Sequence, residues 1–307
     1  MKILVIGDLH LDSKIGSKKV YDFFEVVKDK IIKLSVKCDI TIILGDIFKD
    51  PYPNNYDRKL FSLFLKELKN AYIILGNHDI DINGHSLQQI EPITKDVIIV
   101  DNMINVNDIT LIAYNRDIEK IKTNLIEAKT KYIFGHFDIG NYSINNHTIE
   151  SKISNIVNKD CKVYLGHIHK RQKVNNITYV GSVAPTNLSE LGYEFGVLVL
   201  DNGNEEFINF NYEIKKIVLN SPEEIDKNDI NSNTYLIINL KDLKEKHVYM
   251  NKIKEYLGIE FVIEGQKIEK KEIDFNMDFK NIVYEYLKII KKEYLKEKIY
   301  KYIEEEV

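Results

Sequence analysis

The chain contains very little cysteine and no long apolar run, and each absence narrows what the protein can be. Only two of its 307 residues are cysteines, Cys38 and Cys161. They lack the paired spacing of a zinc or redox motif, so we expect reduced structural thiols. Apolar runs are of strand length, far short of the ~18 residues that a membrane-spanning helix needs. The sequence therefore predicts no membrane association.

The chain also lacks an excess of positive charge. Its formal net charge is −4, from 43 Lys and Arg against 47 Asp and Glu. Binding to nucleic acid would therefore need a local basic patch or a partner protein. The N-terminus runs at once into a strand-like segment, residues 2–7, that is too short for a signal peptide. We therefore expect a cytoplasmic protein.

Five short aliphatic runs each end in glycine and are followed at once by a residue that can bind a metal. Such runs are typical of buried strands, and glycine lets the backbone turn where a strand stops. Ligands at the carboxyl ends of neighbouring strands meet at one crevice of an α/β sheet. Two more histidines, His10 and His169, follow a ligand by two residues, and an extended backbone would point both members of each pair the same way. The seven predicted ligands are Asp8, His10, Asp46, Asn77, His136, His167 and His169.

This set of ligands has a recognisable chemistry. Asp, His and Asn together favour a divalent ion such as Mn²⁺ over a thiolate-bound metal, with Mg²⁺ as an alternative. Seven ligands are too many for one ion, whereas two ions that share a carboxylate, ~3.5–4 Å apart, suit an in-line displacement at phosphorus. A histidine outside the metal ligands could protonate the leaving oxygen, and His78 is the candidate.

The hydrophobic patterns predict two packed sheets with helices outside them. Strands and helices alternate in the first part of the chain, and β-like segments follow over 174–214. The polar residues 220–233 indicate a boundary. The predicted helices are 18–36, 57–69, 116–129 and 243–257, with one or two amphipathic helices over 279–305. The predicted domains are 1–214, a small α+β unit at 215–275 and a helical tail at 276–307.

The motifs together resemble those of the calcineurin-like metallophosphoesterases. They are Gly7-Asp8-Leu9-His10, Gly45-Asp46, Gly76-Asn77-His78-Asp79, Gly135-His136 and Gly166-His167-Ile168-His169, in that order. The resemblance implies an α+β fold in four α/β/β/α layers and a site for two metal ions. It assigns the first ion to Asp8, His10, Asp46 and His169, and the second to Asp46, Asn77, His136 and His167. Asp46 would bridge the ions, and His78 would be the catalytic acid or a stabiliser of the transition state.

A finer resemblance points to one branch of that superfamily. Residues 179–190 (YVGSVAPTNLSE) and 195–201 are similar to segments of the SbcD-type DNA repair nucleases. The likeness covers about residues 1–214, and the overall length is close to that of compact phage nuclease subunits. It implies an Mn²⁺-dependent exonuclease or endonuclease that acts in double-strand-break repair or recombination. A phage-encoded protein would act in the cytoplasm of its bacterial host.

The same resemblance implies partners. Such nucleases bind DNA and work with an SbcC-like coiled-coil ATPase. Residues 215–275 would then cap the DNA and residues 276–307 would dock on the ATPase. The helices near 18–36 and 57–69 would form a homodimer seam. The sequence leaves open that these helices only cover the sheet and that the tail packs on its own domain.

Two positions depart from the SbcD pattern. Cellular members often carry a histidine directly after the phenylalanine of the second motif, whereas Lys49 and Asp50 follow Phe48 here. The proline of their Gly-Ser-Pro segment is replaced by Val183. Neither change touches a predicted metal ligand, so both bear only on the subfamily.

Several residues and functions keep a plainer alternative. Asp79 either orients a ligand or is an ordinary loop residue. Lys170 and Arg171 contact phosphate or belong to a solvated loop. A phosphodiesterase for small substrates such as cyclic nucleotides is the second functional hypothesis, although it would not need the last ~90 residues. A non-catalytic scaffold ranks last because all seven ligands and His78 are present.

Overall fold

The structure is a computed structural model of the chain. It describes residues 1–12, 19–88, 96–144, 147–153, 157–186, 190, 192–212, 215–231, 234–253 and 258–263. Both cysteines are free thiols, as expected. Among the helices in these ranges, none is long and apolar enough to cross a membrane.

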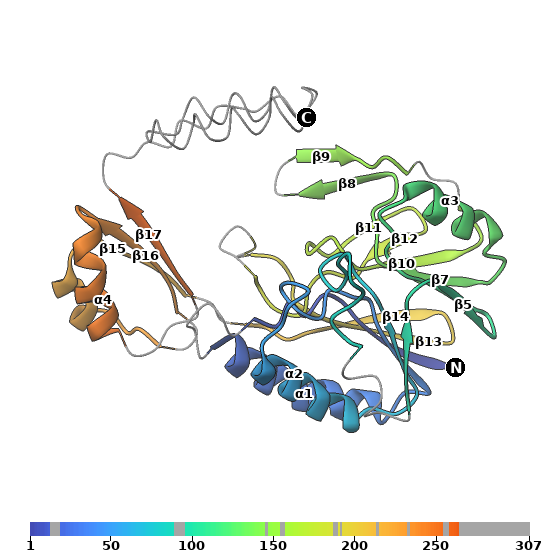
Figure 1. The fold of residues 1–307 in the computed structure, drawn as a ribbon, viewed down its shortest axis with the longest axis horizontal. Helices are drawn as coiled ribbons and strands as arrows, with labels where there is room; N and C mark the ends of the chain where they lie inside the picture. The colour runs from blue at the N-terminus through green and yellow to red at the C-terminus, as the bar shows by residue number, and fades with distance from the viewer. Residues whose placement is uncertain are drawn as a thin grey trace. The chain divides into compact units, whose positions relative to one another are not determined.

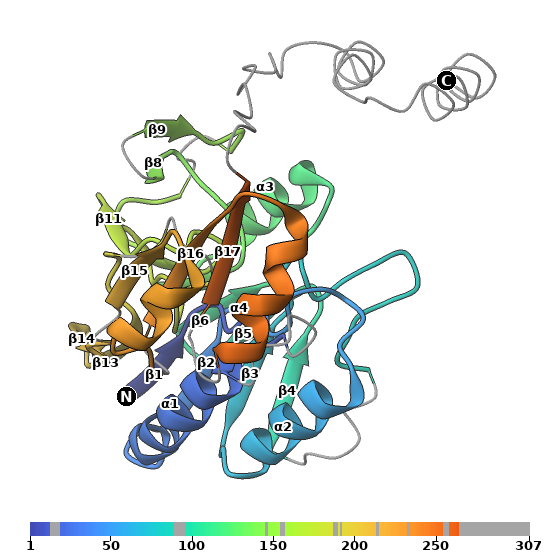
Figure 2. The ribbon, with the colours of Figure 1, turned by 90° about the vertical axis from the view of Figure 1, so that its left-hand side faces the viewer.

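The first sheet places three of the predicted ligand-bearing strands side by side (labelled in Figure 2; the whole fold is in Figure 1). Its strand order is β14-β13-β1-β2-β3-β4. The four strands from β1 to β4 are parallel, so the carboxyl ends of β1, β2 and β3 lie along one edge. The strands are β1 (Lys2–Ile6), β2 (Ile40–Ile43), β3 (Ala71–Ile74), β4 (Val97–Val100), β13 (Gly196–Asp201) and β14 (Asn204–Asn209).

The second sheet carries the other two ligand-bearing strands. Its order is β11-β12-β10-β7-β6-β5, and β6, β7, β10 and β12 run parallel. The carboxyl ends of β7 and β10 are therefore neighbours. The strands are β5 (Met103–Val106), β6 (Ile109–Ile112), β7 (Tyr132–Gly135), β10 (Lys162–Leu165), β11 (Gln172–Val174) and β12 (Ile177–Tyr179).

Alternation along the strands shows how the two sheets pack. Phe134 and Tyr164 belong to the core that also contains the residues of β1 and β2, whereas their neighbours Ile133 and Val163 pack with helix α3 (Ile118–Glu127). Because side chains alternate between the faces of a strand, one face of the second sheet lies against the first sheet and the other lies under α3.

Two helices cover the outer face of the first sheet. Helices α1 (Lys19–Ser35) and α2 (Asn55–Lys66) lie side by side (Figures 1 and 2), with Phe24 and Phe64 in contact at 5.3 Å between ring centroids. Helix α2 begins where the Asn54 side chain accepts the N–H groups of Tyr56 and Asp57. The observed layers are thus helix, sheet, sheet and helix, which confirms the predicted four-layer fold.

A hairpin occupies the connection between β7 and β10, where the sequence predicts no strand. It consists of β8 (Asn141–Ile144) and β9 (His147–Glu150). The Gln172 side chain accepts the N–H of Ser143 at 2.7 Å and donates to its carbonyl at 3.0 Å. One amide therefore fastens the hairpin to β11, just after the last predicted ligand.

A third sheet begins near residue 215 and has its own core. Strands β15 (Lys215–Leu219), β16 (Thr234–Leu240) and β17 (Gly258–Ile263) form it in that order. Alternate residues of β16 are buried and pack with Tyr249 of helix α4 (Lys246–Lys252). Two short 3-10 helices, η3 (Pro222–Lys227) and η4 (Leu243–Glu245), accompany it.

The predicted helix 243–257 is wrong in extent. The α-helical part ends at Lys252, and the buried Ile253 already has extended backbone angles, because it turns inward to join the core of the small sheet. The chain divides into compact units at Met1–Val262 and Ile263–Val307. The predicted tail at 276–307 lies outside the described residues, and the proposed domain boundaries stay predictions.

Candidate metal centre

The structure brings all eight residues of the predicted site together. Each follows the carboxyl end of a strand, three strands in the first sheet and two in the second. The site therefore lies where the ends of both sheets meet, and not along a single sheet. Asp8 and His10 follow β1, Asp46 follows β2, Asn77 and His78 follow β3, His136 follows β7, and His167 and His169 follow β10.

The backbone is not extended at three of these residues. His10, Asp46 and His167 have φ values of 46°, 50° and 75°. The extended backbone expected for the pairs Asp8 with His10 and His167 with His169 is therefore not present. Left-handed residues instead follow three of the five ligand-bearing strands, β1, β2 and β10. Such angles are strained for residues other than glycine and are common at functional sites.

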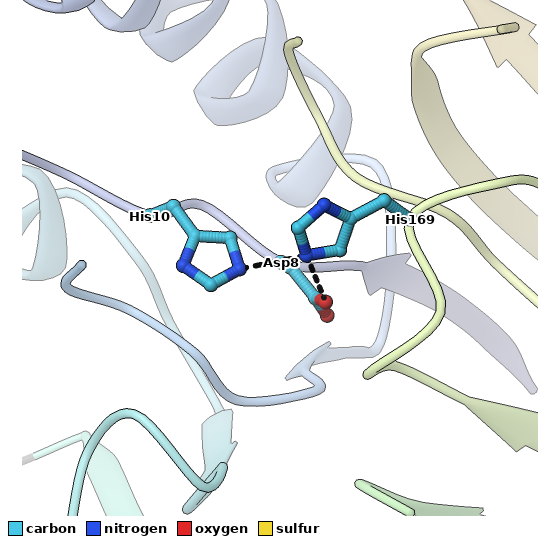
Figure 3. Close-up of side chains that lie close together, drawn as sticks. All are labelled: Asp8, His10 and His169. Atoms are coloured by element: carbon cyan, nitrogen blue, oxygen red, sulfur yellow. Dashed lines mark hydrogen bonds and ion pairs between the residues drawn. The ribbon is translucent and has the colours of Figure 1, made fainter. Parts of the chain in front are cut away.

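One group of possible ligand atoms comes from Asp8, His10 and His169 (Figure 3). The Nε2 atoms of the two histidines are 2.9 Å apart, and Nε2 of His169 is 3.5 Å from Oδ2 of Asp8. Nε2 of His10 is also 3.5 Å from Oδ2 of Asp46. All of these side chains except that of His169 are almost wholly buried.

A second group comes from Asp46, His136 and His167, with Asn77 beside it. Nε2 of His136 lies 3.3 Å from Oδ1 of Asp46 and 3.0 Å from Oδ1 of Asn77. The same Asn77 oxygen is 2.9 Å from Nδ1 of His167. Asp46 thus presents one oxygen toward each group and would contribute a ligand to both ions if two were bound.

The hydrogen bonds outside the site show that the donor set fits cations. Nδ1 of His136 lies 2.6 Å from the carbonyl of Leu44, and Nδ1 of His169 lies 2.7 Å from the carboxylate of Glu190. Both partners only accept hydrogen bonds, so each Nδ1 carries a proton and each ring turns its Nε2 inward. Once it has lost its own proton, each Nε2 offers a lone pair beside carboxylate or amide oxygens, where a divalent cation would bind.

The protein's own charges shift the pKa values of the site strongly. Burial raises the pKa of Asp8 to about 6, although His136 opposes this. For Asp46, burial is outweighed by His136 and His10, and the pKa falls below its usual range. The carboxylates in turn outweigh burial at His136 and raise its pKa to about 9, whereas burial lowers the pKa of His167 to about 4. Protons and cations therefore compete for the same atoms.

His78 forms a third group of possible ligand atoms with His10 and Asp46, and its role as a proton donor stays a prediction. Its side chain is 39% exposed, unlike the buried ligands, and its Nε2 lies 4.0 Å from Oδ2 of Asp46. Nδ1 donates to the carbonyl of Lys49 at 2.7 Å when it carries a proton. A doubly protonated ring could keep that bond and release the Nε2 proton toward a leaving group.

Asp79 ties two ligand loops together. The side chain is fully buried and accepts the N–H groups of Ile47 and Gly76, both at 2.9 Å. Ile47 follows Asp46, and Gly76 precedes Asn77. Burial raises the pKa of Asp79 to about 7. These contacts favour the interpretation in which Asp79 orients ligands.

The two basic residues after His169 do not join the cluster of ligands. Arg171 forms an ion pair with Glu194 at 3.4 Å and lies 4.3 Å from the centroid of the Phe207 ring. Lys170 lies 5.9 Å from the centroid of the Tyr193 ring. Their contact with phosphate stays a prediction.

Sequence reasoning gave no role to Glu190, which contacts His169 directly. The only signal was its place at the end of the segment 179–190 that resembles the SbcD-type nucleases. A carboxylate 21 residues from its partner along the chain has no spacing pattern that would reveal the contact.

Comparison with known proteins places the chain in a family. The profile of the calcineurin-like phosphoesterases matches residues 1–171. The chain is similar at 13% identity to an archaeal phosphodiesterase, over 68% of this chain and 100% of that one, with a TM-score of 0.39. It is similar at 14% identity to a metallophosphoesterase from Sphaerobacter thermophilus, over 69% and 90%, with a TM-score of 0.36. A search of curated proteins found no significant match.

The family match covers every one of the eight site residues. Members of this family use divalent metals, which agrees with the donor atoms that converge here. The chain therefore belongs to the calcineurin-like phosphoesterase family of metal-dependent phosphoester hydrolases.

Proposed function

We propose that the protein is a two-metal DNA nuclease of the SbcD type that uses Mn²⁺. The observation that carries the proposal is a contact between the segment that resembles the SbcD-type nucleases and one of the predicted metal ligands. Residues 179–190 resemble the SbcD-type nucleases, and Glu190 at their end is bonded to the predicted ligand His169 at 2.7 Å. The segment that suggests the subfamily thus belongs to the candidate centre itself.

The roles of the residues follow from their positions. Asp8, His10 and His169 would hold one ion, Asn77, His136 and His167 the other, and Asp46 would contribute to both. When bound, such ions activate a water molecule and offset the charge that builds up on the phosphoryl oxygens. The mixed oxygen and nitrogen donors suit Mn²⁺.

The protein's own groups would do the remaining work. His78 is exposed beside Asp46, so it can reach the oxygen of a leaving nucleotide and protonate it. The main-chain N–H of His78 donates to Oδ1 of Asp46 at 2.9 Å and fixes the direction of that carboxylate. Asp79 holds the loops of Asp46 and Asn77 at a constant separation.

The partners follow from the same proposal. The substrate is DNA, the second subunit is an SbcC-like coiled-coil ATPase, and the active assembly contains a homodimer of this chain. The sheet β15–β17 would cap the DNA. Outer residues of helix α2 support a seam, because Tyr56 and Leu63 are 58% and 50% exposed although both are large and apolar.

The test uses the full chain with Mn²⁺ and end-labelled linear duplex DNA, beside Asp46→Ala and a generic aryl phosphodiester. Loss of DNA cleavage in the variant would support the nuclease, and the product ladder would give its polarity. Hydrolysis of the aryl ester with intact DNA, even after the ATPase is added, would favour a phosphodiesterase for small substrates. Hydrolysis of neither substrate would favour a scaffold.

A further inference from the structure

Glu190 is a buried carboxylate that contacts one predicted ligand directly and is itself held by Thr186. It is 4% exposed, and its Oε1 lies 2.7 Å from Nδ1 of His169. The hydroxyl of Thr186 donates to the same oxygen at 2.8 Å, and the main-chain N–H of Thr186 donates to Oε2 at 2.6 Å. Thr186 therefore holds both oxygens of the carboxylate, one of which also accepts the hydrogen bond from His169.

The contact determines which nitrogen of His169 is available. An ionised carboxylate accepts and does not donate, so Nδ1 keeps its proton and Nε2 is the nitrogen that can offer a lone pair to a cation. That Nε2 points at the cluster, 2.9 Å from Nε2 of His10 and 3.5 Å from Oδ2 of Asp8. With the other tautomer, Nε2 would carry a proton and could not bind a cation.

The two candidate ion sites differ in this outer contact. The corresponding nitrogen of His136 is bonded to a neutral main-chain carbonyl, that of Leu44, whereas His169 is bonded to a full negative charge. A charged acceptor polarises the ring more strongly and makes it a better ligand. The site that contains His169 therefore gains stabilisation that the site containing His136 does not.

We propose that Glu190 is a positioning residue that fixes the tautomer and orientation of His169 and thereby sets the affinity of one ion of the pair. The proposal rests on the assignment of Asp8, His10 and His169 to that ion. The proposal expects a selective effect, because the ligand that Glu190 contacts, His169, belongs to the group of Asp8 and His10 and not to that of Asp46, His136 and His167.

A purely structural role is the competing explanation. The segment that contains Glu190 also meets the two residues after His169, because Tyr193 contacts Lys170 and Glu194 pairs with Arg171. Glu190 could simply join these contacts and hold the segment in place. Glu194→Gln is the matched control, since it removes a carboxylate of the same segment that binds a neighbouring side chain.

The experiment measures Mn²⁺ binding to the full chain by calorimetry after treatment with chelator, for the wild type, Glu190→Gln and Glu194→Gln. We expect two ions in the wild type. Glu190→Gln should weaken one of them by about 10–100-fold and leave the other within about threefold. Glu194→Gln should bind both as the wild type does. Equal binding by all three proteins would overturn the proposal, as would equal weakening of both ions.

Two further measurements separate positioning from folding. The first adds Glu190→Gln to His169→Ala: if Glu190 acts only through His169, the second change alters the affinity no further, whereas an added loss refutes the mechanism. The second follows the ¹⁵N shifts of the histidine rings, assigned with His169→Ala. The proposal requires the Nδ1–H tautomer in the wild type and its loss or mixture in Glu190→Gln, with the circular dichroism spectrum unchanged.

These outcomes are independent of the nuclease assay. A wild type that binds two ions but cleaves no DNA would contradict the proposed function and leave the role of Glu190 standing. A wild type that binds no ion would overturn the role of Glu190, because His169 would then have nothing to hold.

Discussion

Gly76 offers a direct test of how the site is assembled. A Cβ atom at this position would overlap the main-chain nitrogen and Oδ1 of Asp46 and would lie 2.9 Å from Cε1 of His136. The nitrogen belongs to the backbone of another ligand loop, so a side-chain rotation cannot relieve the overlap. Gly76→Ala should therefore push the Asn77 loop away from the loop of Asp46.

The size of the effect follows from this overlap. Overpacking of this kind costs typically about 1–3 kcal/mol of folding stability. For a domain of this size, ~2 kcal/mol lowers the melting temperature by roughly 4–8 °C. A displacement of the ligand loop by ~1 Å can lower the rate of the chemical step by about 100-fold. Thermal unfolding, Mn²⁺ calorimetry and Mn²⁺-dependent hydrolysis of an aryl phosphodiester measure the three quantities.

Gly140→Ala is the control for the loss of a glycine in itself. Gly140 has φ +64° and no heavy atom within 4 Å of its added Cβ, so alanine there meets only backbone strain. We expect a loss of about 1–2 kcal/mol from that strain and unchanged metal binding. If Gly76→Ala bound two Mn²⁺ ions and hydrolysed the ester as well as Gly140→Ala does, the reasoning about close packing of the loops would be refuted.

Three further predictions concern charge and proton transfer. The pKa of His136 is raised from 6.5 to about 9, so its protonation stabilises the folded state by about 3 kcal/mol below pH 6.5, and this stabilisation is lost as the pH rises to 9. The free energy of unfolding, measured in chelator, should therefore fall between pH 6.5 and 9. A flat profile over that range would contradict the prediction. Mn²⁺ at about 100 times its dissociation constant should raise the free energy of unfolding by ~2.7 kcal/mol for each bound ion. Asp46→Ala should lose most of this stabilisation, as measured in a thermal shift assay. His78→Gln should lower kcat by about 10²–10⁴-fold while Mn²⁺ affinity stays unchanged, and an equal loss of both would show that His78 binds the metal instead.

The parts of the fold that could be predicted are those whose sequence has a clear hydrophobic pattern and a glycine that marks the end of the strand. The strands that carry ligands are short aliphatic runs that stop at glycine, and both their positions and their burial follow from that pattern. The hairpin β8–β9 has no such pattern. Its residues are exposed or half-buried, and the side chain of Gln172, more than 20 residues away, fastens it.

The candidate site also has parts that the sequence predicts and parts that it does not. The identity of the ligands could be predicted because each follows a strand end, but the backbone turns that deliver them could not. The left-handed residues His10 and His167 each donate their main-chain N–H to another ligand loop, His10 to the carbonyl of Asp46 at 2.9 Å and His167 to the carboxylate of Asp8 at 3.1 Å, and no local pattern in the sequence reveals these contacts. Glu190 was missed because its contact with His169 joins two loops that approach only in the folded chain.

The carboxylates of the site act both as possible ligands and as parts of the framework. Asp8 accepts the main-chain N–H of His167 at 3.1 Å, which joins the end of β1 in the first sheet to the end of β10 in the second. Asp46 accepts the N–H of His78, which joins the loops after β2 and β3. Removing either carboxylate would therefore loosen the joint between loops and also remove a donor atom.

His167 does not have this double role to the same degree. The imidazole of His167 contacts Asn77, and no main-chain group among the described residues depends on it. Loss of activity in an aspartate variant consequently cannot distinguish a missing ligand from a displaced loop, whereas substitution of His167 tests the donor atom more nearly alone. For this fold, in which two sheets share one site, the metal dependence of the chemistry is therefore best measured on His167.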